Sequence, residues 1–578
     1  MELLNLPEKW NLLFRICRRG FQNMNYKEKY NRWIQCKVVD EKTKQELNEL
    51  SEREIEERFY CDLEFGTGGL RGIMAAGTNR MNIYTVRLAT QGLANEILDC
   101  DGAEEKGVVI AFDSRNNSEL YARECAKVLC ANGIKTYIFD GLRPTPELSF
   151  AVRYLGCARG VVITASHNPK EYNGYKVYGE DGAQIEPETA KKIIGYINNT
   201  DIFDDIKIND GGEVITIGED VDKAYIDAVK NQSLGLSVPE DYKVVYTPLH
   251  GSGNKLVRRV LDEIGVKNVF VVPEQELPDG NFPTVNSPNP ENSEAFTLSI
   301  EYAKKLNADI IFGTDPDSDR IGVVVRNSEG AYVVLNGNQT GTILCEYILR
   351  NMSEKGILAK NASVVKTIVT TEMVKAVSES YGAEIIDVLT GFKFIGEQIK
   401  IFEDEGNAER FIFGLEESYG YLKGSYARDK DAVVAAMLVC EVAAECKAEG
   451  KTLYDRLAEL YEKYGYYLEG LETKTLTGID GRKQIDAIMD KFRTGTLDEC
   501  TRTLTFEVKE VKDYSKGIDG LPKSNVLKFF LSDDSWFAVR PSGTEPKIKF
   551  YFGVAATSLK NAELQLDNLK KAVLNFMV

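Results

Sequence analysis

The fold class of this chain is decided by residues 309–325, which read DIIFGTDPDSDRIGVVV. Both ends of this stretch are apolar, and the two short runs predict the strands Asp309–Phe312 and Ile321–Val325. Between them lies the polar segment Gly313–Arg320, which we call the aspartate loop. Open α/β sheets bind their ligands in loops beyond the carboxyl ends of strands, so this arrangement predicts an α/β sheet with a functional loop.

The same order of strands and helices occurs three times, and each time the last strand leads into a polar loop. The first comprises Val108–Phe112, a helix from Ser118 to Asn132, Lys135–Phe139, and Val161–Ile163 before the serine loop, Thr164–Pro169. The second comprises Lys243–Tyr246, a helix ending near Gly265, Val269–Val272, and Asp309–Phe312 before the aspartate loop. The third comprises Val364–Val369, a helix to about Tyr381, Glu384–Val388, and Phe411–Phe413 before the glutamate loop, Gly414–Gly420. This alternation predicts α/β domains with partly parallel sheets.

Two regions depart from the pattern. Residues 41–60 predict one charged helix, which the glycines from Gly66 onward interrupt. From about residue 465, Thr503–Val511 and Val526–Phe530 predict an antiparallel sheet that supplies the arginine loop, Arg540–Lys547. We expect the four loops to face one another and to line a single central cleft.

Length and charge limit the classes of function. A chain of 578 residues predicts about four domains. The 71 Lys and Arg residues against 89 Asp and Glu residues give a net charge of −18, which disfavours general binding to nucleic acid or to a membrane surface. An anionic substrate would then depend on local clusters of Arg and Lys.

The cysteines, histidines and apolar runs point to the location. The 11 cysteines are scattered and only His167 and His250 are present, so a zinc cage is not expected and a reducing compartment fits best. No apolar run approaches the length of a membrane span, and the cytoplasm is the expected location. Residues 1–23 are interpreted as an upstream extension, with Met24 as the usual start.

The aspartate loop sets Asp315, Asp317 and Asp319 two residues apart. In a bent loop three such carboxylates can converge on a hard cation, and without a cation they would repel one another. An EF-hand is excluded, because Arg320 stands at its sixth position and Arg326 at its twelfth. Spacing alone leaves open an aspartyl-phosphate enzyme, with Asp315 as nucleophile and Asp317 as acid/base.

The serine loop reads TASHNP and places Ser166 beside His167. The G-x-S-x-G elbow of α/β-hydrolases is missing, and His167 is not expected to point at the Ser166 hydroxyl. A serine that carries a phosphoryl group fits better, since its negative charge would complete the cation shell begun by the aspartates. Lys176 could reach the same oxygens. An ordinary turn before Pro169 is the alternative.

The other two loops suit a phosphorylated polyol. In the arginine loop, Arg540 offers a planar fork for phosphate, Ser542 and Thr544 offer hydroxyls, and Gly543 lets backbone amides approach. In the glutamate loop, Glu416 and Ser418 suit paired hydrogen bonds to sugar hydroxyls. Viewed alone, each of these loops also reads as an ordinary surface turn. His250, in LHGSG, is interpreted as a structural residue at a turn.

Together, these four motifs resemble the α-D-phosphohexomutase superfamily over about residues 60 to 555, in the right order. The resemblance implies a heart-shaped arrangement of three α/β domains with mixed sheets and a smaller C-terminal α+β domain. The expected boundaries are 1–45 for an N-terminal extension and helix, 46–210, 211–330, 331–460 and 461–578.

The resemblance also assigns roles to single residues. Ser166 becomes the phosphoserine, and Asp315, Asp317 and Asp319 become Mg²⁺ ligands together with Ser166. Residues implied to act in catalysis are Ser166, His167, Lys176 and Arg71. Residues implied to contact substrate are Arg320, Thr390, Glu416, Ser418, Lys430, Arg540, Ser542, Gly543 and Thr544. His167 and Lys176 remain alternatives for proton transfer.

The implied reaction interconverts glucose 1-phosphate and glucose 6-phosphate through a phosphoserine enzyme and glucose 1,6-bisphosphate. The EESYGY form of the glutamate loop is similar to the phosphoglucomutase branch, which includes phosphopentomutase-like relatives. Many members have Gly directly before the Glu pair, where this chain has Leu415, so a pentose or mannose phosphate stays an alternative substrate. Two functions outside this chemistry stay open as well, an aspartyl-phosphate phosphatase and a non-catalytic phosphosugar-binding protein. A monomer or dimer is expected.

Overall fold

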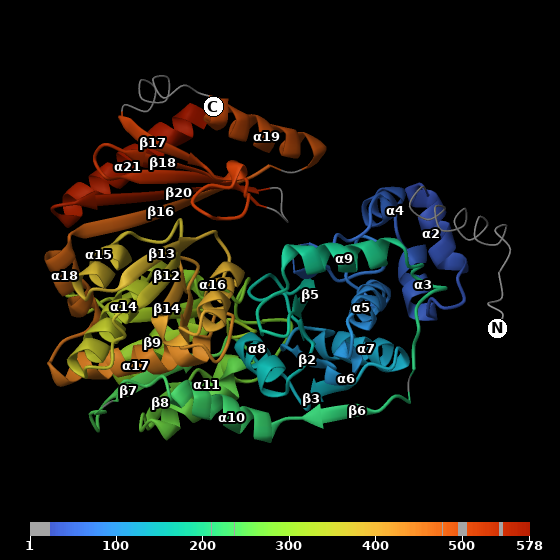
Figure 1. The fold of residues 1–578 in the computed structure, drawn as a ribbon, viewed down its shortest axis with the longest axis horizontal. Helices are drawn as coiled ribbons and strands as arrows, with labels where there is room; N and C mark the ends of the chain where they lie inside the picture. The colour runs from blue at the N-terminus through green and yellow to red at the C-terminus, as the bar shows by residue number, and fades with distance from the viewer. Residues whose placement is uncertain are drawn as a thin grey trace.

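The computed structural model describes residues 24–66, 68–209, 211–235, 237–476, 478–494, 506–542 and 547–577. Four sheets follow one another along the chain, each with its own helices (Figure 1). Three of them mix parallel and antiparallel strands, and the last is antiparallel throughout. This confirms the predicted architecture of three α/β domains and a C-terminal α+β domain. The expected extension of residues 1–23 lies outside the described residues.

Before the first sheet, three short helices pack around the buried side chain of Trp33. They are α2 (Tyr26–Gln35), α3 (Glu41–Asn48) and α4 (Glu52–Phe59). The single helix predicted over residues 41–60 was wrong. Ser51 starts a new helix there, because its side chain accepts the Glu54 amide while the Glu54 carboxylate accepts the Ser51 amide.

The first sheet has the strand order β1-β5-β4-β2-β3-β6. Its strands are β1 (Gly69–Ile73), β2 (Val108–Phe112), β3 (Thr136–Phe139), β4 (Arg159–Ile163), β5 (Tyr172–Tyr178) and β6 (Val214–Ile217). Its helices are α5 (Ile83–Leu98), α6 (Ala103–Lys106), α7 (Ser118–Ala131), α8 (Thr145–Tyr154) and α9 (Pro187–Asn198). The central strand β2 is buried along its whole length, as its unbroken apolar sequence predicts.

The second sheet has the order β11-β10-β9-β7-β8. Its strands are β7 (Lys243–Thr247), β8 (Asn268–Val271), β9 (Ile310–Thr314), β10 (Ile321–Arg326) and β11 (Tyr332–Leu335). Its helices are α10 (Glu219–Lys230), α11 (Gly253–Glu263), α12 (Pro273–Glu276), the 3₁₀ helix Ser293–Phe296 and α13 (Thr297–Leu306).

The third sheet has the order β13-β12-β14-β15. Its strands are β12 (Ser363–Thr367), β13 (Glu384–Val388), β14 (Phe411–Glu416) and β15 (Gly420–Lys423). Its helices are α14 (Gly337–Glu354), α15 (Met373–Ser380), α16 (Lys393–Asp404), the 3₁₀ helix Ala408–Arg410, α17 (Ala432–Ala448) and α18 (Leu453–Tyr464). Helix α17 is apolar on nearly all sides and lies in one core shared by the second and third sheets.

The fourth sheet has the order β16-β20-β19-β18-β17. Its strands are β16 (Tyr466–Thr475), β17 (Val508–Asp513), β18 (Leu527–Leu531), β19 (Trp536–Pro541) and β20 (Lys547–Ala556). Its helices are α19 (Gly478–Thr494), the 3₁₀ helix Tyr514–Lys516 and α21 (Leu559–Met577). In Figure 1 this red sheet lies above the yellow third sheet, and Trp536 and Tyr551 pack against Ile368 and Leu389 of the third sheet's loops.

In each of the first three sheets, the polar loop that carries the candidate site residues occupies an equivalent place. The serine loop joins β4 to β5, the aspartate loop joins β9 to β10, and the glutamate loop joins β14 to β15. Each of these strand pairs is antiparallel, while the first strand of each pair is parallel to its other neighbour. The repeat predicted from the order of elements is therefore a repeat of topology. Among the described residues, none of the helices has both the length and the apolar character that crossing a membrane requires.

Candidate active site

The serine loop holds Ser166 against the aspartate loop. The Ser166 Oγ donates a hydrogen bond of 2.7 Å to Asp315 Oδ2, although the two residues lie 149 positions apart. Ser166 is 3% exposed and adopts a left-handed backbone conformation, with φ of 50°. Thr164 fixes this turn, because its Oγ1 accepts the Ser166 amide at 2.8 Å and donates to Asp113 at 2.6 Å. The serine and the first aspartate thus form one site.

His167 departs from its prediction. The sequence predicted that its imidazole would not point at the Ser166 hydroxyl, yet Nδ1 lies 3.0 Å from Ser166 Oγ. The positive φ of Ser166 turns the chain so that neighbouring side chains meet. Loss of hydration, followed by the positive charges of Arg320 and Arg71, holds the pKa of His167 well below its ordinary value. Burial and these charges therefore favour the neutral form of the imidazole.

Arg115, which our sequence analysis missed, holds the backbone of the serine loop. Its guanidinium donates to four backbone carbonyls: those of Ser166, of Asn168 at 2.5 Å, of Pro169 at 2.9 Å and of Tyr172 at 3.1 Å. The side chain is fully buried, and Asp113 lies 3.4 Å from its Nε. The signal was available, since Asp113-Ser114-Arg115 follows the strand Val108–Phe112 as directly as the recognised loops follow theirs.

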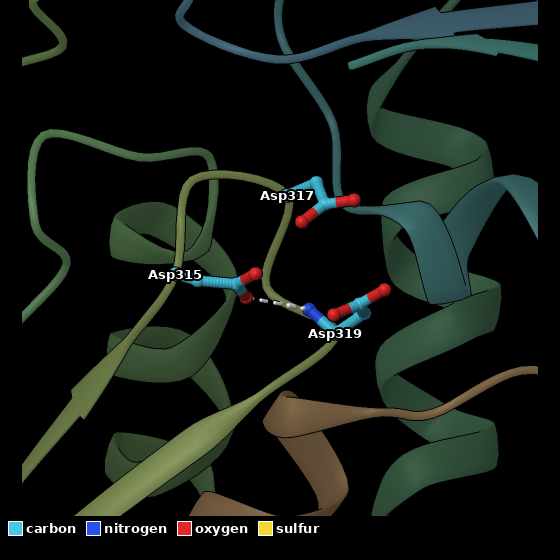
Figure 2. A group of neighbouring side chains, drawn as sticks. All are labelled: Asp315, Asp317 and Asp319. Atoms are coloured by element: carbon cyan, nitrogen blue, oxygen red, sulfur yellow. Dashed lines mark hydrogen bonds between the residues drawn. The ribbon is translucent and has the colours of Figure 1, made fainter. Parts of the chain in front are cut away.

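Asp315, Asp317 and Asp319 converge as predicted. Each offers a carboxylate oxygen within 4.8 Å of the others, and all three are at most 2% exposed. Figure 2 shows the three carboxylates around the bend of the aspartate loop, with the Asp319 amide donating to Asp315 Oδ1 at 3.1 Å. A buried cluster of acidic oxygens is the donor set of a hard divalent cation.

Each aspartate has at least one oxygen held by the protein. Asp315 Oδ1 accepts the amides of Asp319 and Arg320, at 3.1 and 3.0 Å, and Asp317 Oδ2 accepts Lys176 Nζ at 3.0 Å. Asp319 Oδ2 lies 3.1 Å from Lys430 Nζ. By contrast, Asp317 Oδ1 and Asp319 Oδ1 are buried without a hydrogen-bond partner. Because such orphaned oxygens are costly, the residues present fit a cation that these oxygens would bind.

The charges of the cluster support the same conclusion. Burial, followed by the charges of Asp317 and Asp319, raises the pKa of Asp315 well above its ordinary value. Burial also works to raise the pKa of Asp317, but the charge of Lys176 together with side-chain hydrogen bonds, including those from Lys176 and Thr145, outweighs it and holds that pKa below its ordinary value. Asp317 and Asp319 hold the pKa of Lys176 above its ordinary value despite burial. Three carboxylates so close together require positive charge from the protein or from a bound ion.

Lys430, Glu416 and Ser418 join this centre from the third sheet's domain. Lys430 Nζ lies 3.1 Å from both Asp319 and Asp429, and 4.0 Å from Glu416. The Ser418 hydroxyl donates to Glu416 at 2.9 Å. The glutamate loop therefore lies next to the aspartate loop, with a lysine between them.

Arg320 and Arg71 flank the centre. Arg320 is bound by Glu291, a partner that our sequence analysis missed, and its Nε lies 3.8 Å from Asp319. Arg71 stands on β1 and donates to the side chain of Asn168 at 3.1 Å, so it reaches the serine loop from the side.

The remaining predicted residues come from segments of the chain after β13. Thr390 is buried in the turn between β13 and α16. Arg540 is the residue before the last of β19. Burial and then the charge of Glu417 raise the pKa of Tyr551, and the charge of Arg540 acts to lower it. Ser542 closes the base of the arginine loop, its amide donating to the Lys547 carbonyl at 2.8 Å. Gly543 and Thr544 lie outside the described residues.

His250 is a structural residue, as predicted. Its ring nitrogens lie 3.1 Å from the Leu277 carbonyl and 3.0 Å from the Thr284 hydroxyl, which leaves neither nitrogen for chemistry.

A buried serine against three aspartates, at the meeting point of repeated α/β domains, defines an enzyme of the phosphotransferase class, and comparison with known proteins gives its family. Family models described as phosphoglucomutase/phosphomannomutase alpha/beta/alpha domains I, II and III match residues 62–202, 223–330 and 336–464. The corresponding C-terminal domain matches residues 498–571. The chain belongs to the phosphoglucomutase/phosphomannomutase family, as the resemblance of its motifs predicted.

Relatives and solved structures agree with this membership. A phosphoglucomutase of Staphylococcus haemolyticus is 37% identical, with 89% of this chain and 94% of the relative covered. A phosphoglucomutase of Staphylococcus aureus is also 37% identical, with 93% and 97% covered. Among solved structures, a phosphoglucomutase (parafusin) from Paramecium has a TM-score of 0.68 at 16% identity, covering 90% of this chain and 95% of that one. A family protein from Burkholderia thailandensis has a TM-score of 0.65 at 20% identity, with 89% and 97% covered. These two likenesses concern the fold.

Proposed function

We propose that the protein interconverts α-D-glucose 1-phosphate and glucose 6-phosphate, with Ser166 as the phosphoryl carrier. The observation that carries the proposal is the contact of 2.7 Å between Ser166 Oγ and Asp315, within a cluster of three buried carboxylates. A serine in this place can carry a phosphoryl group whose charge a cation neutralises. The names of the relatives at 37% identity support glucose phosphates as substrates.

The cation is inferred to be Mg²⁺, held by Asp315, Asp317, Asp319 and the phosphorylated Ser166. When bound, Mg²⁺ would offset the negative charge that develops on the transferred phosphoryl group. Phosphoryl transfer depends on positioning and charge neutralisation more than on covalent assistance. The protein's own contribution is to hold the serine and the carboxylates rigidly and away from water, as their burial indicates.

The transfer runs in two halves. In the first, the bond from phosphorus to Ser166 Oγ breaks and a bond to the free sugar hydroxyl oxygen forms, giving glucose 1,6-bisphosphate. The hydroxyl loses its proton, and Ser166 Oγ takes up a proton to become a hydroxyl again. In the second, the other phosphate of this intermediate returns to Ser166 after the sugar has turned over. Ser166 Oγ loses its proton as its bond to phosphorus forms, and the sugar oxygen that this phosphate leaves behind takes up a proton, so atoms and charge balance.

Two residues can exchange that proton, and their environments differ. His167 has its Nδ1 3.0 Å from Ser166 Oγ, and burial favours its neutral form, which is the form that can accept a proton. Lys176 is held in its charged form by Asp317 and Asp319, which suits a donor or an electrostatic partner. The variants His167→Asn and Lys176→Met separate these roles, because loss of the group that titrates removes one limb of the pH profile of kcat/KM.

The remaining loops would hold the non-reacting end of the substrate. Glu416 and Ser418 are proposed to bind sugar hydroxyls, with Lys430 and Thr390 beside them. The arginine loop, with Arg540, Ser542, Gly543 and Thr544, is proposed to bind the phosphate that is not being transferred. Arg320 and Arg71 are proposed to neutralise phosphate charge near Ser166.

The compartment is proposed on separate grounds. The nine cysteines of the described residues are all free, which supports a reducing compartment such as the cytoplasm. A monomer or dimer remains our expectation for the assembly.

A coupled assay tests the function. The wild-type protein should convert glucose 1-phosphate in the presence of glucose 1,6-bisphosphate and lose turnover on addition of a chelator. Ser166→Ala should abolish turnover and the mass increase of one phosphoryl group, while Ser380→Ala, a hydroxyl loss at the end of α15, should change neither. Substantial turnover by Ser166→Ala would refute the phosphoserine route.

The same assay distinguishes the competing functions. Comparing rates on glucose 1-phosphate, mannose 1-phosphate and ribose 1-phosphate identifies the preferred sugar, which the departure at Leu415 leaves open. An aspartyl-phosphate phosphatase would release inorganic phosphate and carry its label on Asp315. A non-catalytic sensor would bind without turnover.

A further inference from the structure

Thr145, the first residue of α8, reaches across from the first sheet's domain to the aspartate loop. It is fully buried, and its backbone amide donates to the Asp317 carbonyl at 2.9 Å. Its Oγ1 also donates to Asp317 Oδ2 at 2.9 Å. One residue thus holds both the backbone and the carboxylate of Asp317, from a segment 172 positions earlier in the chain.

The two oxygens of Asp317 have unequal surroundings as a result. Oδ2 accepts hydrogen bonds from Thr145 and from Lys176 Nζ, at 2.9 and 3.0 Å. Oδ1 is buried and has no hydrogen-bond partner. Holding Oδ2 on one side fixes the rotation of the carboxylate and keeps Oδ1 directed away from both donors. Groups that orient a metal ligand in this manner typically set its affinity.

The position of Thr145 is itself rigid. Two residues earlier, Arg143 donates to both oxygens of Asp222 on α10, at 2.7 and 3.1 Å. Lys255 on α11 reaches the same carboxylate at 2.5 Å. These ion pairs dock the start of α8 onto the second sheet's domain, so Thr145 approaches Asp317 from a fixed direction.

We propose that Thr145 is a positioning residue for the divalent cation, which it serves by aligning the carboxylate of Asp317 across the boundary between two domains. The inference rests on the cation site of the proposed function. Since Thr145 belongs to the same domain as Ser166, the contact also fixes the position of the serine relative to the cation ligands. Thr145 does not touch the reacting atoms; it acts through Asp317.

Calorimetric titration of the full chain with MgCl₂, without substrate, tests this role. Thr145→Val keeps the volume and the backbone bond but removes the hydroxyl, and we expect Mg²⁺ binding about 10- to 100-fold weaker. Thr145→Ser keeps the hydroxyl and should bind like the wild type. Thr136→Val is the matched control, because Thr136 is an equally buried threonine of β3 whose hydroxyl bonds the Ile134 carbonyl at 2.9 Å.

Turnover gives a second measurement. In Thr145→Val the Mg²⁺ concentration for half-maximal activity should rise by the same factor, with most of kcat recovered at saturating Mg²⁺. A purely structural role would lower Tm equally with and without Mg²⁺ and leave the affinity unchanged. If the valine variant does not fold, Thr145→Ala provides the same comparison.

The outcomes separate this inference from the proposed function. Mg²⁺ affinity in Thr145→Val within about twofold of the wild type overturns the inference, and so does a wild-type protein that binds no divalent cation. A wild type that binds Mg²⁺ yet shows no mutase turnover overturns the proposed function alone. In that case a weakened affinity in Thr145→Val, rescued in Thr145→Ser, still supports the positioning role.

Discussion

Replacing Arg115 by lysine should displace the serine loop and reduce turnover strongly. The guanidinium of Arg115 donates to four loop carbonyls, those of Ser166, Asn168, Pro169 and Tyr172. Lysine keeps the charge but offers a point-like ammonium with three donors instead of a planar fork with five. We expect it to keep at most two of the four bonds.

The magnitude follows from the bonds that are lost. A hydrogen bond to a charged group contributes about 1.5–3 kcal/mol, so losing two costs about 3–6 kcal/mol at the loop. A loop relieved of that restraint can shift by about 1 Å, and a displacement of that size at a reacting group costs about 100-fold in rate. We therefore expect kcat of Arg115→Lys to fall about 100-fold, with a lower Tm.

The coupled mutase assay and thermal unfolding measure these two effects on the same sample. Arg123→Lys is the matched control, because Arg123 forms an exposed ion pair with Glu119 on α7 and should tolerate lysine. A normal kcat in Arg115→Lys would refute the reasoning about the loop. A lower Tm with a normal kcat would show that Arg115 supports the fold but does not position Ser166.

Three further predictions address the charges of the protein. Removing divalent cations with EDTA should lower Tm, because Asp315, Asp317 and Asp319 then repel one another in a buried site. An unchanged Tm would argue against a cation at this site. Lys430→Met should cost about 3–5 kcal/mol of stability and most turnover, since it removes the ammonium that lies 3.1 Å from both Asp319 and Asp429. Unfolding curves and the mutase assay check both effects, and a fully active variant would contradict the prediction. Burial raises the pKa of Glu469 from 4.5 to about 7, so its stabilising contribution is complete below pH 4.5 and is lost as the pH rises through 7. Glu469→Gln should therefore gain Tm over the wild type at pH 8 and not at pH 4.5, and equal Tm values at both would show that this carboxyl titrates normally.

Most of the centre could be predicted from the sequence because its chemistry is concentrated in short loops. Asp315, Asp317 and Asp319 lie two residues apart, and a bent loop suffices to bring them together. Ser166 stands in a loop that follows a strand in the same manner, so the shared topology of the repeats places it near the aspartates. Local spacing and strand order carried this information.

The contacts that orient the centre were not predicted. Arg115 and Thr145 act through backbone carbonyls and a single hydroxyl, and both residue types are common in turns. His167 was misjudged because the positive φ of Ser166 cannot be inferred from residue type. The helix predicted over residues 41–60 was divided by the capping of Ser51, a local signal that our sequence analysis overlooked.

By itself, the sequence determined the alternation of strands and helices, the antiparallel last sheet and the identity of the charged loops. These features depend on periodicity and on residues that lie close together in the chain. Only the tertiary structure decided which oxygens of the aspartates are held and which are left free, and which side chain reaches Ser166. Those outcomes depend on contacts between distant segments, such as Ser166 with Asp315, 149 positions apart, and Thr145 with Asp317, 172 positions apart. The packing of separate domains sets such contacts, and no local pattern encodes their direction.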